Sequence, residues 1–264
     1  MILPGSYANG FAPRDGSPLY PELWKSCVFA ADPGLGPSGI VLRDWSGYGY
    51  HGSLVASPVY STGICRYAIT LNGSTQYISL PRAVTNTQLN GLPNCAGSGW
   101  FCGSNIDSMF RLQPTGGQYI VLGNSGSLIS HLDGGTTGVT IPTATVNNGQ
   151  WHHVGFNRIA NRSDGLQLFI DGKLSGTRST VATALTFTGT DNGVNLGAYT
   201  NPNVFAPTNG KITDMRIYAR DLTPREFAIL ALRPGIAYEM APRRRSSAAV
   251  QFNRRRRLLV GAGS

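Results

Sequence analysis

The chain has 264 residues, a length that fits one large domain or two small ones. Only 13% of the residues are charged, against about a quarter in average globular proteins, while 41% are hydrophobic and 34 are glycine. This composition excludes a charged, disordered chain and predicts many short strands joined by tight turns rather than helices.

The net charge of +9 is concentrated at the C-terminal end. No acidic residue follows Glu239, and the first 241 residues carry a net charge of only about +2. The seven arginines beyond Pro242 are Arg243, Arg244, Arg245, Arg254, Arg255, Arg256 and Arg257. The body of the chain is therefore nearly neutral, and we do not expect it to be a nucleic-acid-binding domain.

The cysteines leave the redox state open. Cys95 and Cys102 bracket a Gly-rich segment that reads as a turn, so these two could form a disulfide. With Cys27 and Cys65, they could equally be four free thiols in an intracellularly assembled protein, and no spacing matches a CxxC zinc or redox motif.

Neither a secretion signal nor a membrane span is expected. The N-terminal residues lack a charged region followed by an apolar one, and no apolar run approaches the roughly 18 residues of a transmembrane helix.

Taken in chain order, the first elements are an arm and a few short strands. Residues 1–20, rich in Gly, Pro and Ser, predict an N-terminal arm. Strands are predicted at 27–30 and 41–44, followed by a Gly-rich loop over 45–52. Two alternating segments flank Asn72-Gly73, at 67–71 and 76–80, and predict a β-hairpin.

The remaining chain adds more strands and one helix. Further strands are predicted at 109–112, 119–122, 127–132, 138–141, 152–158, 165–170, 173–178, 193–196 and 210–218, with a second hairpin turn at Asp171-Gly172. Thr223, Pro224 and Glu226 have the spacing of a helix start. The sequence predicts an all-β fold, an antiparallel double-sheet jelly-roll β-sandwich over 21–234, with one short C-terminal helix and a tail over 235–264.

Several blocks of sequence resemble the concanavalin A-like, laminin-G-type jelly-roll superfamily. The blocks are 44–54, 68–81, 149–154, 168–173, 195–197, 210–218 and 219–226, and their order also matches. The resemblance implies the same sandwich over roughly residues 40–232. It implies no particular ligand, because the matching residues are mostly scaffold and one fold hosts many functions.

Catalysis is not expected. The glycosidases on this fold use two carboxylates about 5 Å apart, usually on one strand. The three glutamates, Glu22, Glu226 and Glu239, lie near the two ends of the chain, and none shares a strand with an alternating aspartate. No nucleophile elbow or phosphate-binding loop follows a strand.

No cofactor is expected, although calcium is a candidate because many laminin-G-type domains bind it through loop oxygens. The available oxygen ligands are Asp44, Asp171, Asp191, Asn192 and Asp214. We interpret Asp44 and Asp214 as turn caps or arginine partners. The adjacent His152 and His153 would point to opposite faces of a strand and could not chelate one metal together.

An aromatic cluster is the candidate carbohydrate site. Trp45, Tyr48 and Tyr50 precede His51 in the Gly-rich loop, and Tyr199 lies near Asn201 and Asn203. Aromatic rings beside amides suit sugar binding, but Tyr and Trp are also enriched at protein interfaces, and the sequence leaves both interpretations open. His51 is expected to hydrogen-bond within its own loop.

The C-terminal tail predicts a partner. Seven arginines in 23 residues repel one another when unpartnered, which is typical of a solvated basic tail or of a nucleic-acid or localisation patch. Arginine also binds carboxylates of a partner protein by paired hydrogen bonds. The tail arginines, with Phe252 and neighbouring apolar residues as anchors, therefore form the candidate partner-binding site.

Together with the arm, this tail resembles accessory proteins of tailed-bacteriophage virions, which assemble in the host cytoplasm. The resemblance implies a non-catalytic capsid decoration or cement protein bound to a capsid or tail protein, as a homo-oligomer such as a trimer. The alternative is a carbohydrate-binding module for host-glycan adhesion, for example on a tail fibre.

Overall fold

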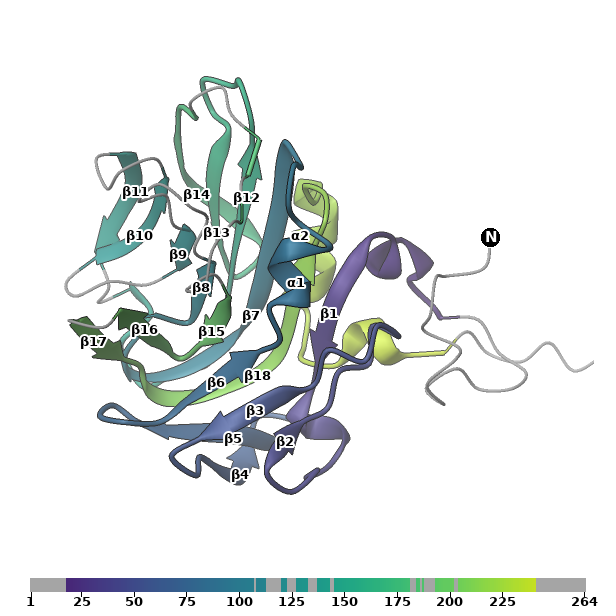
Figure 1. Cartoon of the computed structure of the whole chain (residues 1–264), viewed down its shortest axis with the longest axis vertical. Coiled ribbons are helices and arrows are strands. Elements are labelled where there is room, and N and C mark those ends of the chain that lie inside the picture. Colours follow the sequence, from purple (N-terminus) through teal and green to yellow (C-terminus); the bar gives the residue numbers. More distant parts are fainter. Residues whose placement is uncertain are drawn as a thin grey trace, which may run out of the picture.

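A computed structural model describes residues 18–240, except residues 107, 113–119, 123–126, 133–136, 143–144, 181–183, 186, 188–192 and 202–203. Two antiparallel sheets face each other, with the hairpins β10–β11 and β16–β17 beside them (Figure 1). The predicted all-β, antiparallel sandwich is confirmed.

The larger sheet is organised around β18. Its order is β14-β13-β12-β7-β18-β5-β4, and β1 pairs with the C-terminal half of β18 beyond the end of β5. The strands are β1 (Cys27–Ala31), β4 (Val59–Gly63), β5 (Arg66–Asn72), β7 (Asn94–Asn105), β12 (His152–Ile159), β13 (Leu166–Ile170), β14 (Lys173–Arg178) and β18 (Asn209–Tyr218).

The smaller sheet has the order β2-β3-β6-β15-β8-β9. Its strands are β2 (Val41–Leu42), β3 (Gly52–Val55), β6 (Tyr77–Leu80), β15 (Val194–Leu196), β8 (Phe110–Leu112) and β9 (Ile120–Leu122). The two extra hairpins are β10 (Ser127–Leu132) with β11 (Thr137–Pro142), and β16 (Ala198–Asn201) with β17 (Val204–Pro207).

Helices are few and short. They are α1 (Ala83–Asn86), α2 (Pro224–Leu230) and the 3₁₀ turns η1 (Pro21–Trp24), η2 (Pro33–Leu35) and η4 (Ile236–Tyr238). The predicted start of α2 is confirmed, because Thr223 and Glu226 form a reciprocal capping box. None of the helices in the described part of the chain has the length and apolar character needed to cross a membrane.

Two apolar clusters cover both faces of the larger sheet. The main core fills the space between the sheets and includes Phe156, Met215 and Ile217. The second lies on the outer face, beneath α2, η1 and η4, where Phe227 stacks on Phe169 with ring centroids 3.9 Å apart. The chain-end helical segments therefore act as a third layer over part of the sheet.

This third layer buries the outer face of β18. Side chains alternate along a strand, so Arg216 and Tyr218 lie on the face opposite Met215 and Ile217, and both are nevertheless fully buried. The outer face is covered because α2 and η4 follow β18 in the chain and fold back over it.

The Asn72-Gly73 hairpin prediction is wrong. β5 pairs with β4 and β18 in the larger sheet, whereas β6 pairs with β3 and β15 in the smaller one. The turn therefore crosses between sheets, and Gly73 has the positive φ that such a turn needs. The Asp171-Gly172 hairpin is confirmed, since Ile170 pairs with Lys173.

The Gly-rich segment between Cys95 and Cys102 is not a turn, because both residues lie on β7. Seven residues of extended strand place them about 23 Å apart, far beyond disulfide reach. Glycine is needed here for packing, since a Cβ at Gly97 would lie 2.6 Å from the Phe156 ring. All four cysteines are free.

Candidate functional site

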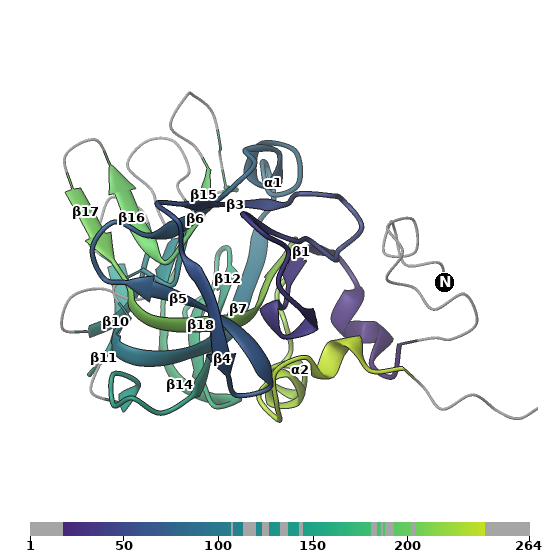
Figure 2. The same cartoon turned by 90° about the horizontal axis from the view of Figure 1, so that it is seen from below.

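The two ends of the described chain meet on one side of the molecule (Figures 1 and 2). Leu19 N donates to Glu239 O at 2.7 Å, and Pro18 and Met240 form an antiparallel bridge. Residues 18–20 and 235–240, assigned above to the arm and the tail, thus pack on the sandwich. Residues 236–238 do so because their side chains are apolar and buried.

We call η1, η4 and the β18 residues beneath them the chain-end clasp. Trp24 of η1 donates its indole N–H to Ala237 O at 2.8 Å, and its ring meets Tyr238 edge-on at 5.1 Å. The guanidinium of Arg216 lies 4.9 Å from the Trp24 ring centroid and 4.5 Å from that of Tyr238. A buried cation between two rings thus links both chain ends to β18.

Carboxylates complete the clasp. Arg216 Nε donates to Asp214 Oδ1 at 3.0 Å, and Gly235 N donates to Asp214 Oδ2 at 2.9 Å. The predicted arginine pairing of Asp214 is therefore confirmed. Burial alone would lower the pKa of Arg216, but the Asp214 carboxylate raises it well above its usual value.

Asp32 lies behind this pair and accepts from Thr213 Oγ1 at 3.0 Å. Burial, with the nearby charge of Asp214, raises the pKa of Asp32 to about 6. Asp32 also connects the clasp to η2, because it caps η2 by accepting from Gly34 N.

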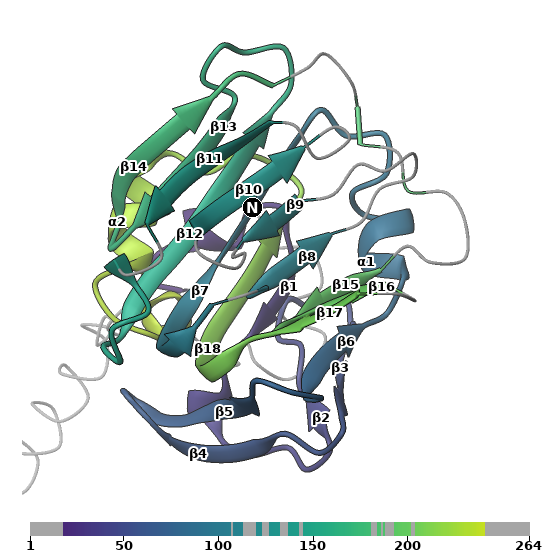
Figure 3. The same cartoon turned by 90° about the vertical axis from the view of Figure 1, so that its left-hand side faces the viewer.

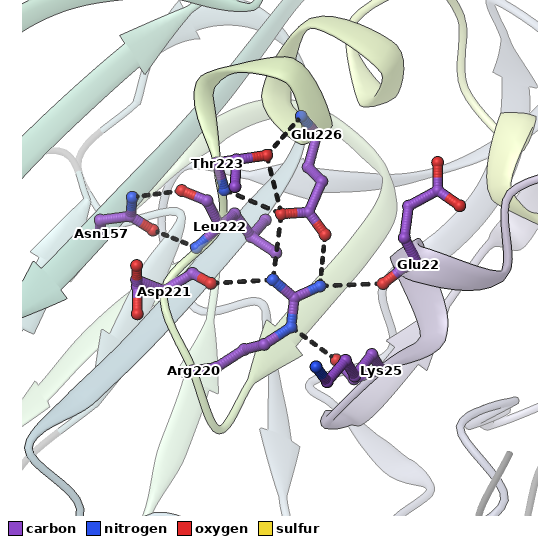
Figure 4. A network of polar contacts seen from close by, with 8 residues as sticks. All are labelled: Glu22, Lys25, Asn157, Arg220, Asp221, Leu222, Thr223 and Glu226. Atoms are coloured by element: carbon purple, nitrogen blue, oxygen red, sulfur yellow. Dashed lines mark hydrogen bonds and ion pairs between the residues drawn. The ribbon is translucent and has the colours of Figure 1, made fainter. Parts of the chain in front are cut away.

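A second polar junction joins η1 to the start of α2 (Figure 4). Arg220 donates to both carboxylate oxygens of Glu226 and to the carbonyl oxygens of Glu22, Lys25 and Asp221. A groove of about 650 Å³ lies beside this junction and is lined by Glu22, Lys25, Arg220 and Arg225 among others. The Arg220 guanidinium in its wall is therefore already hydrogen-bonded to groups of the protein.

The Gly-rich loop that carries the aromatic cluster is folded around Asp44, which is fully buried. Its carboxylate accepts from Ala30 N at 3.0 Å, Ser46 N at 2.8 Å and Tyr50 N at 2.9 Å, and from the Ser46 hydroxyl. The prediction that Asp44 caps a turn is confirmed.

The four candidate sugar-binding residues are held by different contacts. Arg43 lies 4.2 Å over the ring of Trp45, which packs against the second apolar cluster. Tyr48 and Tyr50 stack with centroids 5.6 Å apart, and Tyr48 is 38% exposed. His51 Nδ1 accepts from Asp44 N at 3.0 Å, as expected of a histidine that bonds within its own loop. Tyr48 and His51 are thus the exposed residues of the cluster, whereas Tyr50 is partly buried against the main core.

A pocket of about 170 Å³ adjoins this loop. Trp45 forms part of its wall, and the edge strand β4 contributes Tyr60. The other lining residues are Asp32, Pro33, Leu35, Gly36, Pro37, Ser38, Leu42 and Arg43. The pocket therefore lies between the aromatic loop, η2 and β4.

The calcium candidates that the structure describes are bonded to groups of the protein. Besides Asp44 and Asp214, Asp171 accepts from His153 N and lies 2.9 Å from His152 Nδ1. Among the described residues, no cluster of three His, Cys, Asp or Glu side chains could hold a metal ion. Asp191 and Asn192 lie outside the described residues.

The paired histidines do point to opposite faces. His152 reaches Asp171 at the surface, whereas His153 is buried and meets Trp100 edge-on at 5.6 Å. Burial lowers the pKa of His153 to about 3, so this side chain is a neutral core residue.

The other candidate residues lie where the structure says nothing of their side chains. These are Tyr199, Asn201, Asn203 and the tail residues Arg243, Arg244, Arg245, Phe252, Arg254, Arg255, Arg256 and Arg257. Neither the clasp nor the pocket is predicted by the sequence. The aromatic residues Trp24 and Tyr238 near the two ends were the available signal.

Comparisons with known proteins agree with this architecture. A family model described as the concanavalin A-like lectin/glucanases superfamily matches residues 72–228. No curated protein matches the chain in sequence.

Three solved structures illustrate the shared fold. Domain 4 of AbnA, a GH43 extracellular arabinanase from Geobacillus stearothermophilus solved with arabinotriose, has a TM-score of 0.55 and 21% identity, covering 78% of this chain and 98% of that domain. The binding domain of botulinum neurotoxin serotype D/C has a TM-score of 0.57 and 16% sequence identity, and the match covers 80% of this chain and 52% of that one. Trypanosoma rangeli sialidase has a TM-score of 0.55 and 15% sequence identity, and the match covers 78% of this chain and 32% of the sialidase.

This chain spans about half of the toxin domain, 52%, and a third of the sialidase, 32%. At these identities the likenesses show a fold in common with lectin-like domains. The family match extends over more than half of the residues, and the chain belongs to the concanavalin A-like lectin/glucanases superfamily.

Proposed function

We propose that this chain is a non-catalytic virion structural protein, a capsid decoration or cement protein that clamps neighbouring subunits through its arms. The observation that carries the proposal is the chain-end clasp. Pro18 and Met240 are paired, so the positions from which the arm and the Arg-rich tail continue lie side by side. One partner surface can therefore receive both.

The chemistry of the tail defines that surface. Arginine forks bind carboxylates by paired hydrogen bonds, and the apolar residues between the two Arg clusters, including Phe252, supply anchors. The partner is thus an acidic capsid or tail protein with apolar pockets. A trimer would place three such tails around one quasi-threefold position.

The position of the aromatic loop supports the same role. Trp45 N donates to Ala30 O, and the Trp45 ring packs against the cluster that holds Trp24 and Tyr238. The loop therefore lies on the side of the molecule where the chain ends meet. In an anchored chain, Tyr48 and Tyr50 would face the partner.

Co-sedimentation tests the proposal. Full-length chain and a full-length variant with all seven tail arginines changed to serine are mixed with particles that lack this protein. We expect the unmodified chain to sediment with the particles and the variant to stay in the supernatant, since the charge-assisted hydrogen bonds are lost.

A matched variant with each tail arginine changed to lysine keeps the charge but lacks the planar fork, so partial binding is expected. Tail anchoring would be refuted if the unmodified chain and the serine variant sedimented equally, or if neither sedimented with the particles.

Glycan binding is the second candidate, and the stacked pair Tyr48–Tyr50 favours it. An exposed aromatic ring can pack against the apolar face of a sugar. In a titration against host-surface oligosaccharides, Tyr48→Ala should weaken binding by about tenfold. Tyr67→Ala, another exposed tyrosine, is the matched control. Equal loss in both variants would remove Tyr48 from the site.

A further inference from the structure

Strand β4 forms an open edge of the larger sheet (Figure 3). In the described part of the chain it pairs only with β5, so one side of its backbone has no strand partner. Its sequence, Val59–Gly63, contains no charge and no proline, the features that usually protect an edge from pairing. An open edge of this kind is a template for an added strand.

The other edges of the two main sheets are protected. β14 carries Lys173 and Arg178, and α2 and β11 lie beside it. The Asp44 loop borders β1, because Ala30 N donates to Asp44 Oδ1 and Trp45 N donates to Ala30 O. β2 has only two residues, and β10 lies beside β9. Among the described edges of the two main sheets, β4 is therefore the one that is both long enough and unprotected.

Exposed apolar side chains surround β4. Val59 is 56% exposed and Ile64, just past its end, is 44% exposed. Ile40 is 83% exposed. The loop that contains Ile40 is held against β4 because the Tyr60 hydroxyl donates to Val41 O at 2.9 Å and lies 2.9 Å from Ser38 Oγ.

The pocket described above continues this apolar surface. Tyr60 belongs to both β4 and the pocket wall, with Leu35 and Pro37 beside it. An edge that offers backbone hydrogen bonds, next to a pocket for one side chain, is the arrangement by which proteins bind extended peptides. We call β4 with this pocket the edge groove.

The charge around the edge groove indicates its occupant. The acidic residue that lines the pocket is Asp32, which is buried and accepts from Thr213 Oγ1 and Gly34 N. From residue 33 to residue 106 the single acidic residue is Asp44, which is also buried. Basic groups surround the groove. Arg43 lines the pocket, Arg66 pairs with Gly63, and Lys211 Nζ donates to Thr62 O at 2.9 Å. The Arg-rich tail of this chain, or of a second copy, is a poor electrostatic match.

We propose that the edge groove binds an extended segment of a partner protein in which apolar and acidic residues alternate, added as a strand along β4. One apolar side chain would enter the pocket between Leu35, Trp45 and Tyr60, while the acidic residues face Arg43, Arg66 and Lys211. This adds a second contact to the assembly role proposed above. It is tested on the isolated chain, so either proposal can fail while the other stands.

The probe is the synthetic peptide Glu-Val-Glu-Phe-Glu-Val-Glu, with Glu-Ser-Glu-Ser-Glu-Ser-Glu as its matched control. The Arg-rich tail binds both peptides by charge, whereas only the first can fill an apolar pocket. In hydrogen–deuterium exchange on the full-length chain, we expect the first peptide to slow exchange at residues 59–63 and the second to leave it unchanged.

Charge-swapped variants locate the binding. Val59→Glu with Thr62→Glu should weaken binding of the first peptide by about tenfold or more, because like charges are placed opposite each other. Val59→Lys with Thr62→Lys disturbs the strand equally but should bind at least as tightly. Leu174→Glu, on the protected edge β14 and 51% exposed, should change nothing.

Four outcomes would overturn the proposal. In the first, the first peptide fails to protect residues 59–63 from exchange. In the second, the Glu pair and the Lys pair weaken binding equally. In the third, residues 59–63 are protected in the free chain and the protection disappears when residues 242–264 are removed, which would assign the groove to this chain's own tail. In the fourth, an oligosaccharide protects these residues instead of the peptide, which would assign the groove to a sugar.

Discussion

Replacing Arg216 with alanine is expected to lower the free energy of unfolding by about 3–5 kcal/mol. The substitution leaves the carboxylate of Asp214 buried without its cation and removes the group between the rings of Trp24 and Tyr238. Urea denaturation followed by tryptophan fluorescence measures the change, since Trp24 lies in the clasp.

Two further variants separate the buried charge from the loss of packing. Adding Asp214→Asn to Arg216→Ala should recover part of the loss, because a neutral amide is cheaper to bury than an unpaired carboxylate. Arg225→Ala, at an exposed arginine of α2, should stay within about 0.5 kcal/mol of the unmodified chain. A loss below about 1 kcal/mol for Arg216→Ala would show that the clasp is not a stabilising unit.

Replacing Asp44 with alanine is expected to cost about 3 kcal/mol or more and to disorder the aromatic loop. The backbone N–H groups of Ala30, Ser46 and Tyr50 would lose their acceptor, and each unsatisfied buried donor costs about 1–3 kcal/mol. Denaturation measures the stability, and hydrogen exchange at residues 45–51 reports on the loop.

Asp44→Asn is the conservative control, because its single amide oxygen can still accept two of these bonds. It should fall between alanine and the unmodified chain. Ser46→Ala, which removes the hydroxyl bonds to Val28 O and Asp44 and the bond accepted from Tyr48 N, should cost about 1 kcal/mol. If Asp44→Ala cost no more than Ser46→Ala, the carboxylate would not organise the loop.

Local signals predicted local structure well. The capping box at Thr223 and Glu226 and the Asp171-Gly172 turn each depend on residues a few positions apart, and both form as expected. Asn72-Gly73 has an equally strong local signal, but the strands that it joins belong to different sheets. Turn chemistry specifies a reversal of the chain, whereas strand partners depend on contacts distant in sequence.

The candidate site was predictable only in part for the same reason. The sequence indicated that Asp44 would cap its loop, because the partners at Ser46 and Tyr50 are close in sequence. The bond from Trp24 to Ala237 joins residues 213 positions apart, and no local pattern reveals it. The burial of Arg216 likewise depends on η1 and η4 together, so β18 alone suggested an outward-facing side chain.

The pairing of Pro18 with Met240 also determines how the molecule would carry a mechanical load. A force transmitted along the arm or the tail enters through Leu19 or Glu239 and reaches β18 through Trp24, Tyr238 and Arg216. A pull that separates the two ends breaks their few hydrogen bonds one after another. A pull on both ends in the same direction loads the contacts of Trp24, Tyr238 and Arg216 at the same time. The face-to-face packing of the two sheets lies outside the path of this force.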